Sequence, residues 1–231
     1  SVEDIQTSID RLAQEIESAQ ILMLVGGFSS GDEPDGSGKF IATVLKNPKV
    51  NAAIQKMRAN EGLILGICNG FQALIKSGLL PYGDVTKLDE NNPTLFRNNI
   101  NRHVSHIART RITSNKSPWL QGLVPGSMYS IAMSHGEGKF TASQEVVEKL
   151  IVNGQVVTQY VNEFGHPTMN GLDNINGSTM AIEGICSEDG MILGKMGHSE
   201  RYEDGLFQNI AGDKDQDIFA NGVRFFTHKS C

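Results

Sequence analysis

Apolar residues in the first stretch of the chain recur with the period of an α-helix, and the stretch after it is apolar throughout. Ile5, Ile9, Leu12 and Ile16 recur at intervals of three and four residues within "IQTSIDRLAQEIESA". This spacing places one apolar stripe on a helix. The next segment, "QILMLVGG", is a short unbroken apolar run that ends in two glycines, which predicts a strand buried on both faces.

The same order of elements then repeats. "KFIATVLKNPKVNAAIQKMRANEG" has helical character, and Pro48 breaks it or starts a second helix. "LILGIC" is another buried strand, and "NGFQALIKSGLL" is a helix that Gly78 stops, with Pro81 beyond it. Strands alternating with helices indicate βαβ units. We therefore predict an α/β protein with a mostly parallel central sheet and flanking helices.

The second half of the chain is less regular. Four segments look like β structure: "HIARTRITS", "SMYSIAMSHGEGKF", "VVTQYVN" and "STMAIEGICS". "SQEVVEKLIVNG" predicts a helix, and "GMILGKMGHSERY" predicts a strand that runs into a loop. We find no internal repeat and no low-complexity linker, so we treat residues 1–231 as one domain.

Composition narrows the class of protein. The chain has 231 residues, a net charge of −6 and 39% hydrophobic residues, which is ordinary for a globular domain with a real core. The acidic balance argues against a nucleic-acid partner. No apolar run is long enough to span a membrane. Three cysteines without a CxxC motif indicate neither a disulfide framework nor a zinc site, so we expect a reducing, cytoplasmic location.

One cysteine stands in a pattern that carries chemistry. Gly66-Ile67-Cys68-Asn69-Gly70 places Cys68 between two glycines at a predicted strand-to-helix junction. This G-x-nucleophile-x-G pattern is the nucleophile elbow, in which small residues let neighbouring chain approach a strained turn. The N–H groups of the following helix would favour the thiolate. The alternative is a buried, inert cysteine.

A thiol nucleophile needs a base and donors for an oxyanion. His198 follows a predicted strand, and Glu200 lies two residues on, on the same side of an extended chain. Glu200 can then orient the imidazole toward the thiol. The alternative is a surface histidine beside surface charges. Backbone N–H groups of Asn69 and of Gly27, in the "VGGFSSGD" loop, are the candidate oxyanion donors.

Other motifs do not carry a function. "GSGKF" departs from a phosphate-binding loop, because Glu33 and Phe40 stand where that loop needs Gly and Ser or Thr. His103 and His106 in "HVSH" have no accompanying carboxylate or thiol ligand, so we expect no metal site. We interpret Cys186 as a strand cysteine.

At this point the motifs resemble a known family. "GICNGFQ" followed far downstream by "GHSE" is similar to the class I (triad) glutamine amidotransferases, which have a flavodoxin-like sheet. "GGFSSGD", "LGICNGFQALIKSGLLP", "MSHGEGKF" and "GKMGHSERY" together resemble the glutaminase portion of the phosphoribosylformylglycinamidine synthases. The resemblance extends from about residue 21 to residue 226.

The resemblance implies a reaction and a set of roles. The substrate would be L-glutamine, and Cys68 would form a glutamyl thioester with His198 as acid and base and Glu200 as its orienting group. Ammonia would pass to a synthetase domain or subunit that converts formylglycinamide ribonucleotide to formylglycinamidine ribonucleotide in purine biosynthesis. ATP and Mg²⁺ are expected only on that partner, and no cofactor is expected in this chain. The substrate-binding positions implied are Phe28, Gln72, Ser134, His135 and Gly136.

The sequence also departs from the family. Its members open with a strand carrying an "FPG"-like motif before the segment with which this sequence starts, so we expect the sheet to lack that strand and to expose an edge. We expect the chain to be the C-terminal part of a longer synthase. Two alternatives stay open: another cysteine hydrolase on the same fold (a γ-glutamyl hydrolase or a DJ-1/PfpI-like protein), and an inactive docking module.

Overall fold

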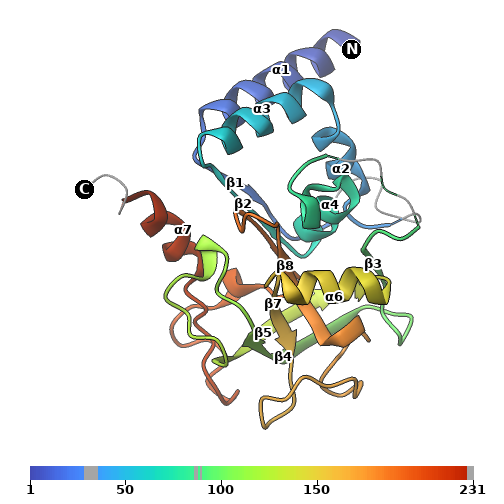
Figure 1. Ribbon diagram of the computed structural model, residues 1–231, viewed down its shortest axis with the longest axis vertical. Coiled ribbons are helices and arrows are strands. Elements are labelled where there is room, and N and C mark those ends of the chain that lie inside the picture. The colour runs from blue at the N-terminus through green and yellow to red at the C-terminus, as the bar shows by residue number, and fades with distance from the viewer. Residues whose placement is uncertain (29–35, 86–87, 89, 228–231) are drawn as a thin grey trace.

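The computed structural model describes residues 1–28, 36–85, 88 and 90–227 (Figure 1). Residues 29–35, which are part of the predicted loop "FSSGDEPDGSGKF", and the last cysteine, Cys231, lie outside them. The helices are α1 Val2–Ser18, α2 Lys39–Leu45, α3 Pro48–Ala59, α4 Asn69–Ser77, α5 Leu79–Tyr82, α6 Gln144–Val152 and α7 Ile218–Thr227. The strands are β1 Ile21–Leu24, β2 Leu63–Ile67, β3 Thr94–Arg97, β4 Val104–Ile112, β5 Met128–His135, β6 Glu137–Thr141, β7 Val156–Tyr160, β8 Ile182–Cys186 and β9 Ile192–Lys195.

A seven-stranded sheet in the order β1-β2-β9-β8-β7-β4-β5 forms the centre of the described part of the chain. The predicted α/β class with flanking helices is confirmed. Parallel pairing joins β1, β2 and β9, whereas every other neighbouring pair in this sheet is antiparallel. The sheet is therefore mixed, with its parallel part around the strand that leads to Cys68. The sequence predicted the strands of this sheet. Which strands lie next to each other, and in which direction, depends on tertiary pairing that a local pattern does not reveal.

Strand β2 lies inside the sheet between β1 and β9, and all five of its residues are buried. Strand β1 is an edge strand in the described sheet, and Met23 on it is 42% exposed. This exposed edge agrees with the expectation from the sequence, while the absence of a further strand of the family stays a prediction.

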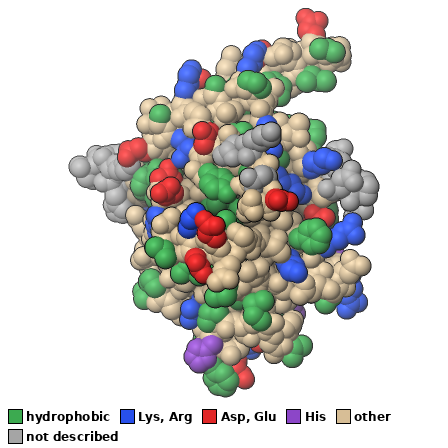
Figure 2. All heavy atoms as spheres, turned by 45° about the vertical axis from the view of Figure 1, so that its right-hand side comes forward, with side chains coloured by type: hydrophobic (Ala, Val, Ile, Leu, Met, Phe, Trp, Pro, Cys, Tyr) green, Lys and Arg blue, Asp and Glu red, His purple; other side chains and the backbone are tan. Residues whose placement is uncertain are grey.

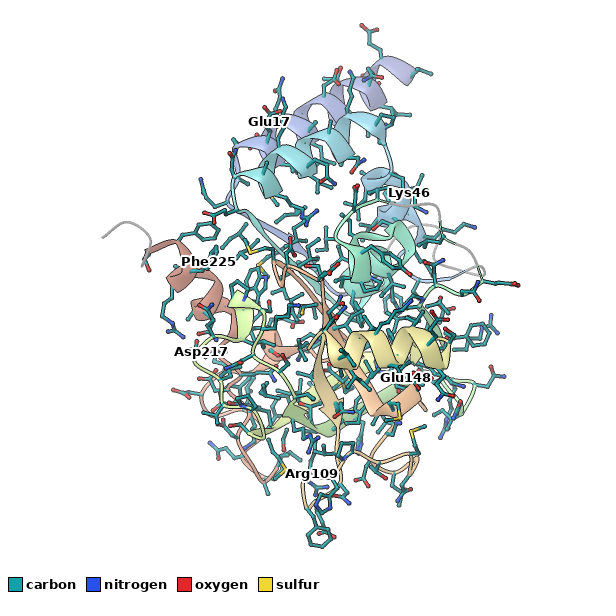
Figure 3. All side chains as sticks on the ribbon, viewed as in Figure 1. Glu17, Lys46, Arg109, Glu148, Asp217 and Phe225 are labelled. Carbon is teal, nitrogen blue, oxygen red and sulfur yellow. The ribbon has the colours of Figure 1, made fainter. Side chains whose placement is uncertain are left out.

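The N-terminal helices pack as the periodicity predicts. Helix α1 lies along α3 (Figure 1) and buries Ile16 against it. Ser1 caps α1 together with Asp4: the Ser1 hydroxyl accepts a hydrogen bond from the Asp4 N–H, and the Asp4 carboxylate accepts one from the Ser1 ammonium. Glu17, at the far end of α1 in Figure 3, accepts a 2.9 Å hydrogen bond from Lys56 of α3. The break at Pro48 is confirmed, since Pro48 begins α3.

Two elements were not predicted. Strand β3 pairs with β6 in a separate two-stranded sheet, so the "SMYSIAMSHGEGKF" segment forms two strands that belong to different sheets. Helix α7, the second of these elements, packs beside Trp119, with which a Cβ on Gly222 would collide.

No helix within the described ranges is long and apolar enough to cross a membrane. Figure 2 shows acidic and basic side chains interspersed over one face of the molecule.

Candidate active site

Cys68 sits at the turn between β2 and α4, with φ 52° and ψ −105°. A non-glycine residue with this conformation is strained, and close packing on both sides holds it. A Cβ on Gly66 would lie 2.5 Å from the Leu74 side chain. A Cβ on Gly70 would overlap the carbonyl oxygen of Leu24. The predicted reason for both glycines is thus confirmed: neighbouring chain passes where a side chain would be.

The Cys68 sulfur is buried and lies 3.5 Å from the carbonyl oxygen of Ser134. Burial raises the pKa of the Cys68 thiol to about 11, although the backbone N–H groups of Asn69 and Gly27 and the charge of Arg201 each lower it. The N–H group at the helix start lowers the pKa as expected, but desolvation outweighs this effect. The thiol is protonated near pH 7 and requires a base.

The residues predicted as base and orienting group, His198 and Glu200, lie in direct contact. The His198 ring is buried, and its Nδ1 lies 2.5 Å from Glu200 Oε1. The His198 Nε2 has no hydrogen-bond partner in the described residues, so this nitrogen is left for a reacting proton. Burial acts to raise the pKa of Glu200, but the hydrogen bond with His198 outweighs it and holds that pKa below its ordinary value.

The cysteine and the histidine meet across Gly26. A Cβ built on Gly26 would lie 3.3 Å from the Cys68 Cβ and 2.6 Å from the His198 Cε1. Because both side chains approach the same point, the fold brings together two residues that are far apart in the sequence. The hydrogen bond from the His198 N–H to the carbonyl of Ala132, at 2.8 Å, fixes the backbone of the histidine against β5.

The two predicted oxyanion donors lie at the same place. The backbone N–H groups of Gly27 and Asn69 both face the Cys68 sulfur closely enough to lower the pKa of its thiol. A carbonyl carbon bonded to that sulfur would place its oxygen near these groups, as an oxyanion hole requires. Gly27 has φ 132°, a conformation that favours glycine.

A hollow of about 40 Å³ opens beside the sulfur. All five substrate-binding positions implied by the resemblance line it. The full lining is Gly27, Phe28, Ser37, Cys68, Gln72, Ser134, His135, Gly136 and Arg201. Gln72 is buried, and its side-chain amide donates to the Glu137 carbonyl, so its position is set before any substrate binds. The roles of these residues toward a substrate stay predictions.

Three residues at the site were missed. Ser37 and Arg201 line the hollow, and Asn98 supports the segment that carries His135. The Asn98 side chain donates to the His135 carbonyl at 2.8 Å and accepts from the Gly138 N–H at 3.1 Å. The sequence could have predicted the place of Arg201 at the site, since Arg201 directly follows Glu200. No local pattern could have predicted the role of Asn98, because its hydrogen-bond partners are distant in sequence.

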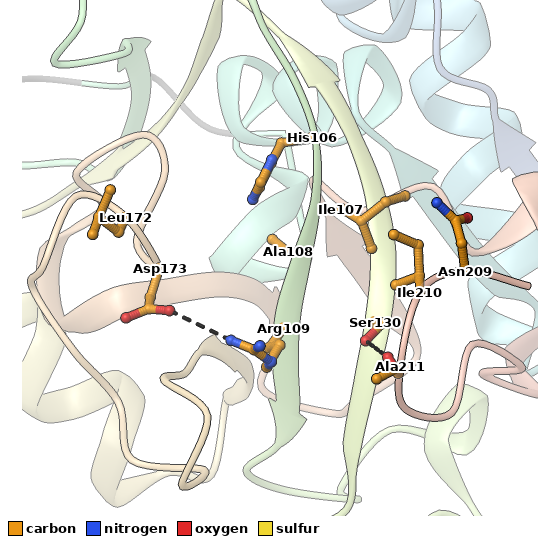
Figure 4. A pocket seen from close by; sticks show the side chains of 10 residues that line it. All are labelled: His106, Ile107, Ala108, Arg109, Ser130, Leu172, Asp173, Asn209, Ile210 and Ala211. Atoms are coloured by element: carbon orange, nitrogen blue, oxygen red, sulfur yellow. Dashed lines mark hydrogen bonds and ion pairs between the residues drawn. The ribbon is translucent and has the colours of Figure 1, made fainter. Parts of the chain in front are cut away.

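The histidine pair of "HVSH" separates. His103 Nε2 lies 3.0 Å from Ser134 Oγ beside the candidate site, while His106 lines a different hollow (Figure 4). That second hollow, about 380 Å³, shares no lining residue with the one at Cys68. It holds the ion pair of Arg109 with Asp173, whose charged atoms are 3.8 Å apart. Larger volume alone does not make it the reaction site, because no cysteine lines it and its one hydroxyl, on Ser130, donates to the Ala211 carbonyl.

Comparisons with known proteins agree with the geometry. The CobB/CobQ-like glutamine amidotransferase domain family matches residues 2–226, and the chain belongs to this family. Within it, the chain is similar to the proteins named phosphoribosylformylglycinamidine synthase subunit PurQ. The one from Rhodopseudomonas palustris is 32% identical over 204 residues, covering 84% of this chain and 80% of the relative. The one from Thermomicrobium roseum is 34% identical over 200 residues, covering 87% and 76%.

Solved structures give the same result. The chain resembles the structure of PurLQS from Thermotoga maritima with a TM-score of 0.65 and 26% identity, covering 90% of this chain and 80% of that one. It also resembles the glutaminase domain of Trypanosoma brucei CTPS, solved with bound acivicin, with a TM-score of 0.52 and 13% identity, covering 93% and 75%. The second likeness concerns the fold alone.

Proposed function

We propose that this chain is the glutaminase component of a phosphoribosylformylglycinamidine synthase and releases ammonia from the side-chain amide of L-glutamine. The observation that carries the proposal is the approach of Cys68 and His198 to one point at Gly26, with Glu200 bound to the far nitrogen of the imidazole. The family to which the chain belongs supports the same reaction.

The first step transfers a proton and forms a thioester. As the Cys68 sulfur attacks the amide carbon of glutamine, His198 Nε2 accepts the thiol proton, which a pKa of about 11 otherwise retains. The amide oxygen becomes an oxyanion, which the N–H groups of Gly27 and Asn69 stabilise. The C–N bond then breaks, His198 returns the proton to the departing nitrogen, and ammonia leaves.

The second step restores the enzyme. A water molecule gives a proton to His198 and attacks the glutamyl thioester, and the same two N–H groups stabilise the second oxyanion. The C–S bond breaks, glutamate leaves, and the sulfur regains its proton. Glu200 stays ionised throughout, because its hydrogen bond with His198 lowers its pKa, and it stabilises the imidazolium in both steps.

The pocket residues have the chemistry of an amino-acid site. We assign the main-chain groups of Ser134, His135 and Gly136 and the amide of Gln72 to contacts with the amino-acid end of glutamine. Arg201, at the same hollow, carries the positive charge that a substrate carboxylate needs.

Ammonia released here has a consumer of defined chemistry. We propose that a synthetase domain or subunit binds this chain and uses the ammonia to convert formylglycinamide ribonucleotide to formylglycinamidine ribonucleotide. The similarity to proteins named as subunits of that synthase supports this partner. We place the ATP and Mg²⁺ of that reaction on the synthetase, and we propose that this chain needs no cofactor, binds neither nucleic acid nor a membrane, and works in the cytoplasm.

Glutamate release from glutamine tests the proposal. Wild type, Cys68→Ala and the control Cys186→Ala are compared, alone and with the synthetase added. Cys186 is also a buried thiol, but it lies in β8 and does not line the hollow. We expect activity in wild type and Cys186→Ala and none above background in Cys68→Ala. Equal rates in the two cysteine variants would contradict the proposal.

A labelling experiment separates the other cysteine hydrolases. Iodoacetamide should modify Cys68, and L-glutamine should protect it, whereas a folate polyglutamate should not. Protection by the folate alone would instead identify a γ-glutamyl hydrolase.

A further inference from the structure

Directly behind His198, two oppositely charged side chains are fully buried. Lys195 at the end of β9 and Glu183 on β8 are each 0% exposed in their side chains, and Lys195 Nζ lies 3.8 Å from Glu183 Oε1. The mechanism above uses neither residue. Burying two charges is costly, and apolar side chains of the same volume are often equally stable. The pair therefore calls for an explanation beyond packing.

Lys195 makes contacts on both sides of the base. Its ammonium donates to the carbonyl of Gly197 at 3.3 Å and to the hydroxyl of Ser199 at 3.0 Å. These residues precede and follow His198 in the chain. The Ser199 hydroxyl in turn donates to Gln216 at 2.8 Å, so the chain of hydrogen bonds continues into the loop before α7.

Glu183 holds the same turn from the other side. Its Oε1 accepts a 2.5 Å hydrogen bond from the Gly197 N–H, and its Oε2 accepts one of 2.5 Å from Thr158. A Cβ on Gly197 would lie 2.9 Å from Glu183 Oε1 and 3.0 Å from Lys195 Nζ. The ion pair thus packs directly against the backbone that leads into His198.

The main chain of Lys195 also reaches the nucleophile. Its carbonyl oxygen accepts a 2.9 Å hydrogen bond from the Cys68 N–H. One residue therefore contacts the backbone of the strained cysteine through its carbonyl and the backbone around the histidine through its ammonium. Burial raises the pKa of Glu200, whereas His198 and, to a smaller extent, the Lys195 charge lower it.

We propose that Lys195, with its charge balanced by Glu183, is a positioning residue that holds the turn carrying His198 in place beside Cys68. The proposal rests on the glutaminase reaction proposed above. It predicts that loss of the ammonium reduces the rate of the chemical step and leaves glutamine binding nearly unchanged, because neither side chain lines the hollow at Cys68.

The test uses a charge-free pair of similar volume. Lys195→Met combined with Glu183→Gln removes both charges and keeps an acceptor for the Gly197 N–H. The matched control is Lys56→Met with Glu17→Gln, which removes a surface ion pair between α1 and α3. Thermal unfolding checks that each protein folds, and kcat and KM are measured separately for glutamate release.

We expect the buried double variant to lose about 10- to 100-fold in kcat with KM within about 3-fold of wild type, since small displacements of reacting groups cost rates of this order. The control pair should leave both constants unchanged. A folded double variant with wild-type kcat would overturn the proposal, as would a raised KM with unchanged kcat.

A milder variant decides the matter if the double variant does not fold. Ser199→Ala takes away one ammonium contact while the ion pair stays intact. We expect kcat to fall by about 3- to 10-fold at constant KM, and a wild-type kcat here would overturn the proposal. A wild type that releases no glutamate, with or without the synthetase, would refute the glutaminase function instead, so the two failures are distinct.

Discussion

Gly26 and His198 are packed so closely that a Cβ on the glycine would lie 2.6 Å from the ring carbon Cε1. The glycine comes from the loop after β1, and the histidine follows β9. The missing side chain is what lets the imidazole lie beside Cys68. Gly26 thus has a structural role next to the N–H donor at Gly27.

This contact makes Gly26→Ala a test of the site. The added methyl group must push the imidazole away from Cys68, so we expect kcat for glutamate release to fall by about 10²-fold while the protein still folds. The control is Gly171→Ala, where a Cβ would meet nothing within 4 Å. An active Gly26→Ala protein would show that His198 does not react from the position seen here.

Glu200→Gln separates orientation from charge. Glutamine keeps the size of the side chain but lacks the carboxylate that accepts the hydrogen bond from the Nδ1–H of His198, so the imidazole loses its preferred tautomer and the imidazolium its counter-charge. We expect kcat to fall by at least about 10²-fold with little change in KM.

The exposed neighbour Glu203 provides the control for that variant. Glu203→Gln should keep wild-type kcat. A Glu200→Gln enzyme as fast as Glu203→Gln would remove Glu200 from the triad.

The rate of Cys68 alkylation should depend steeply on pH. Because burial raises the pKa of Cys68 to about 11, the thiolate fraction grows about tenfold for each pH unit below that value. We expect the iodoacetamide rate, followed by mass spectrometry of the Cys68 peptide, to rise without a plateau from pH 7 to about pH 10. A plateau near 8.5, the ordinary thiol value, would show that the resting enzyme already holds a thiolate.

His135 should make the protein sensitive to acid. Burial, together with the nearby His103 and His198, lowers the pKa of His135 to about 4. The unfolded chain therefore takes up the proton first, so the contribution of His135 to stability is present above about pH 6.5 and is lost as the pH falls toward 4. We expect the free energy of unfolding to fall by about 1.4 kcal/mol per pH unit in this range.

Denaturant unfolding of His135→Gln checks this slope. The variant should lose part of the acid dependence, while the control His166→Gln, at an exposed position, should keep the wild-type slope. Identical slopes in all three proteins would contradict the role given to His135.

Local patterns were sufficient for most elements and for the elbow. The period of Ile5 to Ile16 predicted α1, and the apolar run at residues 63–67 predicted a buried strand. Strand β3 and helix α7 were missed, because β3 is formed by pairing with β6 and α7 by packing on Trp119. The direction of pairing was also beyond local pattern, and the sheet is mixed rather than mostly parallel.

The candidate site divides in the same way. The sequence by itself determined the types of group: a thiol between two glycines, an imidazole with a carboxylate two residues on, and a glycine-rich loop. Residue type, spacing and glycine placement are local properties that a pattern can carry. Only the tertiary structure decided that β1, β2 and β9 lie side by side, so that Gly26, Cys68 and His198 meet.

Tertiary structure also decided the protonation state of the nucleophile. The elbow pattern favoured a thiolate, yet burial raises the pKa of Cys68 far enough to keep it a thiol. Likewise, nothing in the segment "GKMGHSERY" distinguishes Lys195 from a surface lysine, and its burial against Glu183 follows from the pairing of β9 with β8. Desolvation depends on what packs around a group, and residues far apart in the sequence supply that packing.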